Sequence, residues 1–506
     1  MRVSDTGQAQ GPLDGRDPTR ADLPFRRPPH PLHVMGLPTI AAPLTRPMRD
    51  MGIADLLSAF ASASYTPLDY VAELVAAIEA LPAGTQSVLR LTPDAQAAAD
   101  DSSRRWAAGR PRPLEGVPFG VKDIIDVAGA GVTCGSLFTG DRIAAADAHV
   151  VSRLRAAGAI PMAITATTEF AAGSPHNPRF GAVHNPWDET RWTGGSSTGS
   201  GAALAARLMP FALGTDTGGS IRVPSCWCGT TGLKPSRELV SRRGVAPLSW
   251  TLDHVGPMAR SAADIARVLP FMTAEPDPSV IAGCATLSAQ PPGRPLRIGV
   301  PQTWFTERVD RSVLENWGIA LKVFDALGHR LIDMPPIDIA PWHEAGWIIL
   351  QSELAALQHD RLDRAELFDP GLLVRLRNGL GYSAVDYISA LQARIDAQAA
   401  LGAAMAEVDV MITPGIGGEA GRLDTMTVDI NGEAVAFQHI ISRNTMIFDV
   451  TGFPALMAPS GFGAAGLPTG IQIISRPGED VLCLEAAIAF QNATDHHNAM
   501  PPGAGL

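Results

Sequence analysis

Hydrophobic residues recur at steps of three and four over residues 53–108, as Leu56, Phe60, Leu74 and Ile78 illustrate. This spacing puts apolar side chains on one face of a helix, so we expect amphipathic helices that cover a core. Residues 116–127, GVPFGVKDIIDV, instead form a short β-prone run around one lysine. We therefore expect that lysine, Lys122, on or beside a strand.

Helical and strand-like patterns alternate along much of the remaining chain. A helical pattern at 149–157 precedes a strand pattern at 159–164, and a strand pattern at 294–301 precedes a helical one at 312–328. Residues 342–408 are largely helical and end in a buried strand at 408–413, whereas residues 173–256 are dense in Gly, Ser, Thr and Pro and predict mostly loops. Such alternation is typical of the α/β class, a sheet with helices packed on it.

No internal repeat or low-complexity linker divides the chain, so we expect one large domain over residues 51–506 with a helical insert around 342–408. Residues 1–50 are rich in Pro, Arg and Asp and have no apolar core, which predicts a poorly ordered tail rather than a secretory signal.

Composition excludes several classes of protein. A net charge of −11 lacks the basic surface that binds a phosphate backbone, so we expect no nucleic-acid partner. Five cysteines in 506 residues argue against a disulfide framework and favour the cytoplasm. The chain contains no apolar run of about eighteen residues, so we expect no membrane partner. Cys226 and Cys228 are too closely spaced for a usual zinc pair, and we expect no metal.

Two glycine- and serine-rich segments carry the candidate chemistry, TGGSSTGSG at 193–201 and GTDTGGSIRVPS at 214–225. Glycines let successive backbone amides point into one concavity, although flexible loops are the simpler interpretation. Neither segment has the lysine of a phosphate-binding loop. Residues 195–199 formally match G-x-S-x-G, which would make Ser197 a nucleophile, but polar PWDETRW precedes them in place of a buried strand.

These two segments, together with GLKPS at 232–236, resemble the signature of the amidase signature family. Further segments are similar, among them GVPFGVKDIIDVAG, LDHVGPMARSAAD and FDVTGFPALMAPSG, and the resemblance runs from about residue 53 to residue 497. It implies a central twisted mixed β-sheet covered by helices. It also implies hydrolysis of a carboxamide C–N bond through a serine acyl-enzyme, without a cofactor.

The resemblance implies a role for individual residues. The base would be Lys122, the serine in an unusual cis peptide Ser196, and the nucleophile Ser220. The backbone amides of the oxyanion hole would be those of Thr217, Gly218, Gly219 and Ser220. Supporting roles would fall to Ser197, Thr198, Asp216 and Arg222.

Aromatic residues near these segments predict a hydrophobic substrate pocket, although core packing is the alternative interpretation of each. The candidate pocket residues are Phe138, Phe170, Trp192, Trp227 and Trp250. We therefore expect an amidase of the aryl acylamidase or urethanase type, which acts as a monomer or homodimer on a small-molecule amide or carbamate. The alternative is the glutamine-hydrolysing subunit of a tRNA-dependent amidotransferase.

Overall fold

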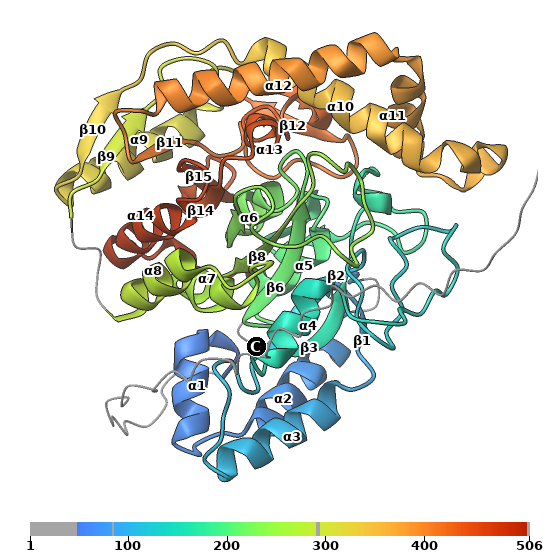
Figure 1. Cartoon of the computed structure of the whole chain (residues 1–506), viewed down its shortest axis with the longest axis vertical. Helices are drawn as coiled ribbons and strands as arrows, with labels where there is room; N and C mark the ends of the chain where they lie inside the picture. The colour runs from blue at the N-terminus through green and yellow to red at the C-terminus, as the bar shows by residue number, and fades with distance from the viewer. Residues whose placement is uncertain (1–47, 83–84, 290–293, 503–506) are drawn as a thin grey trace, which may run out of the picture. The chain divides into compact units, whose positions relative to one another are not determined.

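An eleven-stranded mixed sheet runs through the described part of the chain (Figure 1). The computed structural model describes residues 48–82, 85–289 and 294–502, so the tail expected at 1–50 lies almost wholly outside it. In spatial order the strands are β1 (Val88–Leu91), β3 (Ile160–Thr165), β2 (Pro118–Lys122), β6 (Phe211–Asp216), β8 (His254–Ala259), β7 (Thr231–Lys234), β14 (Ala455–Phe462), β15 (Pro468–Ile474), β11 (Val410–Pro414), β9 (Arg297–Val300) and β10 (Arg330–Asp333).

Parallel pairing occurs in two places in this sheet. Strand β2 runs parallel to β3 and β6, and β9 runs parallel to β10 and β11, whereas the other neighbours are antiparallel. Two small hairpins stand apart, β4 (His184–Asn185) with β5 (Asp188–Trp192) and β12 (Thr427–Ile430) with β13 (Glu433–Ala436). The predicted α/β class with a central mixed sheet is confirmed.

Helices pack on the sheet. The α-helices are α1 (Ile53–Ala61), α2 (Pro67–Glu79), α3 (Ala95–Ala107), α4 (His149–Ala156), α5 (Thr198–Ala205), α6 (Arg222–Cys228), α7 (Ala262–Val268), α8 (Pro278–Ala289), α9 (Arg311–Ala326), α10 (Ala340–Gln358), α11 (Pro370–Gly381), α12 (Ala384–Ala404), α13 (Met446–Thr451) and α14 (Asp480–Ala493). Short 3-10 segments are η1 (Met48–Asp50), η2 (Glu169–Ala171), η3 (Leu269–Phe271), η4 (His359–Leu367), η5 (Phe437–His439) and η6 (His496–Asn498).

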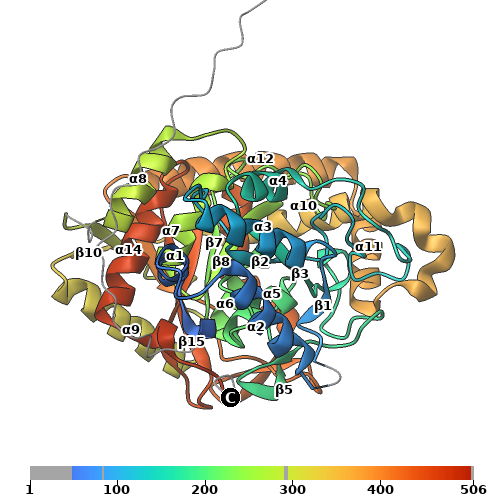
Figure 2. The ribbon, with the colours of Figure 1, turned by 90° about the horizontal axis from the view of Figure 1, so that it is seen from below.

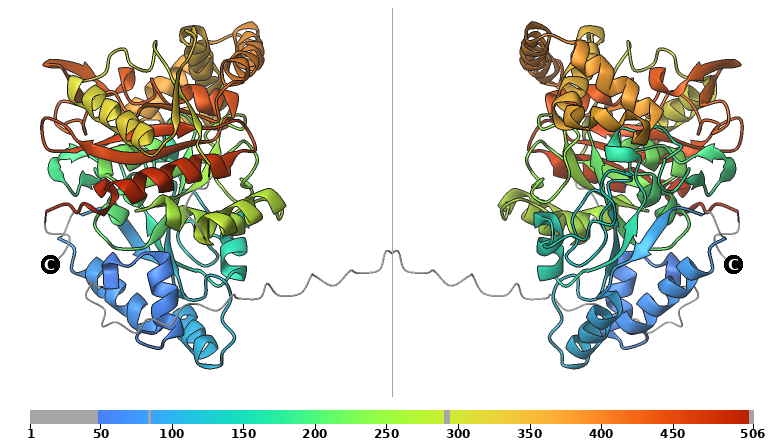
Figure 3. Two further views of the ribbon diagram at one scale, coloured as in Figure 1. Left: turned by 90° about the vertical axis from the view of Figure 1, so that its left-hand side faces the viewer. Right: turned by 90° about the vertical axis from the view of Figure 1, so that its right-hand side faces the viewer.

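The N-terminal helices and the helices of residues 340–404 lie at opposite ends of the described part of the chain (Figures 1 and 3). Figure 2 shows α1, α2 and α3 together on the face turned to the viewer. Their buried residues, such as Leu56, Phe60 and Leu74, share a core cluster with Met162 of β3, as the helical spacing predicts. At the other end α10, α11 and α12 pack together, and α10 and α12 also contact α13.

Two further groups of helices pack on the sheet itself. Helices α5 and α6 contact each other, with α5 on β2, β3, β6 and β8 and α6 on β7, β14 and β15. Helices α7, α8, α9 and α14 form the second group. No helix among the residues that the structure describes is long and apolar enough to cross a membrane.

The prediction that residues 173–256 form mostly loops is wrong in part. This stretch contains α5, β6, α6 and β7, and these four elements are buried along their whole length. Elements that are buried on all sides lack the alternation or helical period that reveals half-exposed ones, and their glycines resemble those of loops. Gly199, for example, leaves no room for a Cβ, which would lie 2.2 Å from the backbone nitrogen of Ala166.

The parallel pair β2 and β6 brings the candidate residues to one edge of the sheet. Strand β2 ends at Lys122, and β6 ends at Asp216, four residues before Ser220. Neighbouring parallel strands end at the same edge, so the lysine and the second serine-rich segment must lie close together.

Candidate active site

Lys122 is fully buried and its amine contacts three hydroxyl groups. Nζ lies 2.7 Å from Oγ of Ser196, 3.0 Å from Oγ of Ser197 and 2.8 Å from Oγ1 of Thr215. Thr215, which immediately precedes Asp216 on β6, lies in the quoted GTDTGGSIRVPS segment, but nothing in the sequence singled it out from its neighbours. The structure thus brings together two of the three predicted catalytic residues in direct contact.

The surroundings of Lys122 favour the neutral amine. Burial lowers its pKa to about 7, and the more distant carboxylates of Asp216 and Asp253 only partly oppose this effect. Its hydrogen-bond partners are hydroxyl groups, which can either accept a proton from the amine or donate one to it. Near neutral pH the side chain can therefore act as a proton acceptor.

Ser196 and Ser220 line one cavity. The Gly195–Ser196 peptide bond is cis, the feature expected of that serine. The two serine segments are joined directly, because the backbone N–H of Ser197 donates to the carbonyl of Ser220 at 3.1 Å. The cavity wall comprises Thr168, Ala171, Gly173, Trp192, Gly195, Ser196, Thr217, Gly218, Gly219, Ser220, Val223, Leu248, Trp347, Leu350, Arg375, Ile441, Ser442 and Met446.

The backbone at residues 217–220 forms a tight turn beside this cavity. The N–H of Gly219 donates to Asp216 Oδ1 at 2.6 Å, while those of Thr217, Gly218 and Ser220 have no hydrogen-bond acceptor in the described part of the chain. Gly219 has φ of 124°, and a Cβ there would lie 2.4 Å from Oγ1 of Thr445. A left-handed glycine is therefore required at this position.

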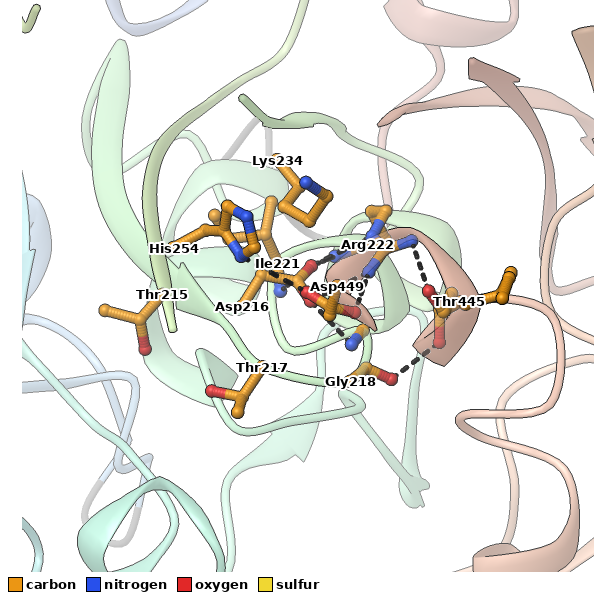
Figure 4. A network of polar contacts seen from close by, with 12 residues as sticks. Thr215, Asp216, Thr217, Gly218, Ile221, Arg222, Lys234, His254, Thr445 and Asp449 are labelled. Carbon is orange, nitrogen blue, oxygen red and sulfur yellow. Dashed lines mark hydrogen bonds and ion pairs between the residues drawn. The ribbon is translucent and has the colours of Figure 1, made fainter. Parts of the chain in front are cut away.

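Asp216 and Arg222 stabilise this turn through hydrogen bonds and an ion pair (Figure 4). The Asp216 carboxylate accepts from the backbone N–H groups of Gly219, Ile221 and Arg222 and from the Arg222 guanidinium. Burial alone would raise the pKa of Asp216, but the ion pair with Arg222 outweighs it and holds that pKa well below its usual range. Both side chains are fully buried and support the turn rather than face the cavity.

Figure 4 shows that Arg222 extends this network to a segment far away in sequence. Its guanidinium donates to Asp449 at 2.6 Å, to the carbonyl of Thr445 and to Gln472, while Oγ1 of Thr445 donates to the carbonyl of Gly218. Burial and the neighbouring Asp216 raise the pKa of Asp449 well above its usual range. Sequence patterns gave no reason to select Asp449, although it lies within the quoted FDVTGFPALMAPSG segment.

The five predicted pocket aromatics occupy different surroundings. Trp192 lines the cavity, whereas Trp227 is fully buried and donates from Nε1 to the carbonyl of Gly418. Trp250 is 48% exposed and lines a neighbouring cavity. Phe138 packs on Phe368, and the Phe170 ring faces Arg361. Of the five predicted aromatic residues, all of which the structure describes, Trp192 alone is among the residues that line the cavity with Ser196 and Ser220.

Arg375 of α11 is a lining residue that the sequence patterns did not single out. Its Nη1 donates to the carbonyl of Ala172 at 2.6 Å, and its guanidinium lies over the Trp347 ring at 5.5 Å. These contacts hold a positive charge at the cavity wall. Its place in a largely helical region of mixed polarity carried no sign of such a role.

The chain matches the family model named Amidase over residues 69–484. It is 34% identical to the A-type subunit of the glutamyl-tRNA(Gln) amidotransferase of Thioalkalivibrio sulfidiphilus, over 90% of this chain and 100% of the relative. It is 36% identical to the protein of the same name from Ralstonia pickettii, over 80% of this chain and 90% of the relative.

Solved structures agree with this match. One, described as a vestigial protein complex that reveals the evolutionary origins of an s-triazine catabolic enzyme, has 31% identity and a TM-score of 0.81 over 87% of this chain and 98% of that one. The peptide amidase of Stenotrophomonas maltophilia has 28% identity and a TM-score of 0.74 over 90% of this chain and 99% of that one.

The names of the relatives contradict one expectation from the sequence. We expected a monomer or homodimer with a small-molecule substrate and no nucleic-acid partner, but these relatives are named as subunits of an amidotransferase for a glutamyl-tRNA. The expectation is wrong because it rested on the charge of one chain. In an assembly another subunit can supply the positive surface that contacts phosphates.

Proposed function

The chain belongs to the amidase family of carbon–nitrogen hydrolases, and on that premise we propose that it hydrolyses a carboxamide through an acyl-enzyme on Ser220. The observation that carries the proposal is the contact of 2.7 Å between the buried Lys122 amine and Ser196, at a cavity that Ser220 also lines. A serine hydroxyl needs a base to become a nucleophile, and a neutral lysine can serve as that base.

In the first half of the reaction Lys122 accepts the proton of Ser196, and Ser196 accepts the proton of Ser220. The Ser220 oxygen then bonds to the amide carbon, and the carbonyl oxygen becomes an oxyanion. The backbone N–H groups of Thr217, Gly218 and Ser220, which have no acceptor in the described part of the chain, support the stabilisation of this oxyanion. Donors that are already in place need no rearrangement when the negative charge forms.

In the second half the C–N bond breaks as Ser196 donates a proton to the departing nitrogen and regains one from Lys122. Water then attacks the ester carbon of the acyl-enzyme and loses its proton through the same two residues. Release of the carboxylic acid restores Ser220 with its proton, so the cycle neither gains nor loses protons at the enzyme.

For the substrate we propose a carboxamide that also bears a carboxylate, the class to which glutamine belongs. Arg375 is the charged side chain among the lining residues, and it would pair with that carboxylate. The names of the relatives support the same class, and we propose that the chain works as the amide-hydrolysing subunit of an assembly.

A hydrophobic or aryl amide, or a carbamate, is the second candidate substrate. Apolar side chains favour it, since Trp192, Trp347, Leu350, Ile441 and Met446 all line the cavity. Such walls bind large apolar groups through burial of surface.

A comparison of kcat/KM tests both candidates. The substrates are glutamine, acetamide, an anilide and an aryl carbamate, with ammonia or amine release as the readout. A tenfold or greater preference for glutamine over acetamide that disappears in Arg375→Met supports the carboxylate-bearing class. Turnover of the anilide or carbamate alone would replace it with the second candidate, and no turnover of any amide by enzyme that folds would refute amide hydrolysis itself.

A further inference from the structure

Three polar side chains in the cavity wall have no hydrogen-bond partner in the described part of the chain. They are Oγ1 of Thr168, Nε1 of Trp192 and Oγ of Ser442, and their residues are only 3%, 3% and 4% exposed. Buried polar groups without a partner are rare in native proteins, because each has lost its water without a replacement. Three of them around one cavity point to a ligand that supplies the missing partners.

The indole of Trp192 packs against Gly195, the residue before Ser196. A Cβ on Gly195 would lie 2.6 Å from Cζ2 of the Trp192 ring, and Cζ2 and Nε1 are attached to the same ring carbon. The ring stacks on Phe437 with centroids 5.3 Å apart and meets Trp227 edge-on at 5.9 Å. An indole N–H can only donate, so its partner in the cavity must be an acceptor.

The hydroxyl groups of Thr168 and Ser442 lie on other parts of the same wall. The Thr168 methyl group is 3.3 Å from the position of a Cβ on Gly195, and the Ser442 Cβ is 4.0 Å from that of a Cβ on Gly218. Trp192 and Thr168 therefore lie beside Gly195, next to Ser196, and Ser442 lies beside Gly218, two residues before Ser220.

The charges at the cavity exclude a cationic group on the substrate. Arg375 contributes a positive charge, and no lining residue in the described part of the chain is Asp or Glu. The nearby buried carboxylates already have partners, Asp216 in the ion pair with Arg222 and Glu169 with Ser136 and the backbone of Asp369. An ammonium group would lose its water, meet no free carboxylate and be repelled by Arg375.

We propose that Thr168, Trp192 and Ser442 form a neutral polar subsite that selects carboxamides with hydrogen-bond acceptors and no amino group. The substrate class is the monoamide of a short dicarboxylic acid, or a related compound with a second carbonyl in its chain. This inference rests on the proposed function and narrows it. Glutamine, which differs from glutaric acid monoamide by one ammonium group, is the poorer substrate.

Three matched amides test the selection. Glutaric acid monoamide has the carboxylate without the ammonium group, glutamine has both, and pentanamide has neither. We expect kcat/KM for the monoamide to exceed that for each of the others by about tenfold or more, the loss expected when a buried charge lacks its partner. Equal or better turnover of glutamine or pentanamide, or turnover of none of the three, would overturn the proposal.

Variants of the subsite test its residues. Trp192→Phe removes the indole N–H and keeps a ring, and Ser442→Ala removes the hydroxyl. Each should reduce the preference for the monoamide over pentanamide severalfold, whereas Ser442→Asp should shift the preference toward glutamine because it adds a partner for the ammonium group. The control is Ser352→Ala, since the Ser352 hydroxyl is also buried without a partner but does not line the cavity. The proposal fails if the control and the subsite variants change the preference equally.

Labelling with a fluorophosphonate separates failure of this inference from failure of the proposed function. If Ser220 is labelled in every variant but the three amides show no selection, the serine chemistry stands and the subsite is refuted. If Ser220 is not labelled in the unchanged protein, the proposed function is refuted first.

Discussion

Lowering the pH should switch off acylation of Ser220 with a midpoint near the pKa of Lys122. The base must be neutral to accept a proton, and burial lowers its pKa to about 7 from an ordinary value of 10.5. Because the protonated amine is the inactive form, activity must fall as the pH falls through 7, rather than as it rises.

The expected size of this effect follows from the fraction of neutral amine. With a pKa of about 7, roughly nine-tenths of the lysine is neutral at pH 8 and roughly one-tenth at pH 6. The acylation rate should therefore fall about tenfold between these two values and about tenfold more for each further pH unit. Above pH 8 the rate should reach a plateau.

Single-turnover acylation by a fluorophosphonate, followed from pH 5.5 to pH 9, measures this rate without the later steps. Asp253 needs a control, since burial raises its pKa to about 6 and it accepts a hydrogen bond from Thr217 Oγ1 at 2.7 Å. Asp253→Asn keeps an acceptor there and removes one of the charges that raise the Lys122 pKa, so it should move the midpoint somewhat below 7 without abolishing it. A rate that is flat between pH 6 and pH 8, or a midpoint lost in Asp253→Asn, would refute Lys122 as the titrating base.

Three further predictions concern the same site. Asp216→Asn removes the charge that orders the turn before Ser220, and it should lower kcat by about a hundredfold, measured by steady-state amide hydrolysis; a change below threefold would contradict this role. In the unchanged protein, unfolded Lys122 binds a proton up to about pH 10.5 and folded Lys122 only up to about pH 7. The free energy of unfolding therefore rises with pH in this window, and Lys122 contributes about 2 kcal/mol of that rise from pH 7 to pH 9. Lys122→Met should remove this contribution. Urea unfolding at both pH values checks this, and identical pH slopes for the two proteins would argue against a depressed pKa. EDTA should leave activity unchanged, since the described residues contain no group of three or more metal-ligating side chains placed to hold an ion; activity lost to EDTA and restored by zinc would contradict a metal-free reaction.

The spacing of hydrophobic residues along the sequence predicted those helices and strands whose apolar residues follow a local period. The β-prone run at Lys122 and the amphipathic helices near Leu56 and Leu74 correspond to β2, α1 and α2. The stretch that contains the fully buried elements between residues 198 and 234 was predicted as mostly loops, because glycines that permit close packing look the same in sequence as glycines that permit turns.

Candidate residues of the site were predictable where a motif carried them. Lys122, Ser196 and Asp216 lie in such motifs, and the structure brings them to one edge of the sheet. The pairing of Arg222 with Asp449 joins residues 227 positions apart and has no local signature.

Sequence alone also could not separate the two tryptophans near the serine loops. Trp192 lines the cavity, and its indole N–H has no acceptor among the described residues, whereas Trp227 packs in the core and donates to the carbonyl of Gly418. Arg375 reaches the cavity from α11, and only the packing of that helix determines this position.

Identification of the serine that forms the acyl-enzyme tests the central claim most directly. Peptide mass spectrometry after fluorophosphonate labelling should find the label on Ser220 in the unchanged protein and no label in Ser220→Ala. Ser197 is the informative alternative, because it stands in the G-x-S-x-G sequence and contacts Lys122 at 3.0 Å. A label on Ser197, or full amidase activity in Ser220→Ala, would contradict the account.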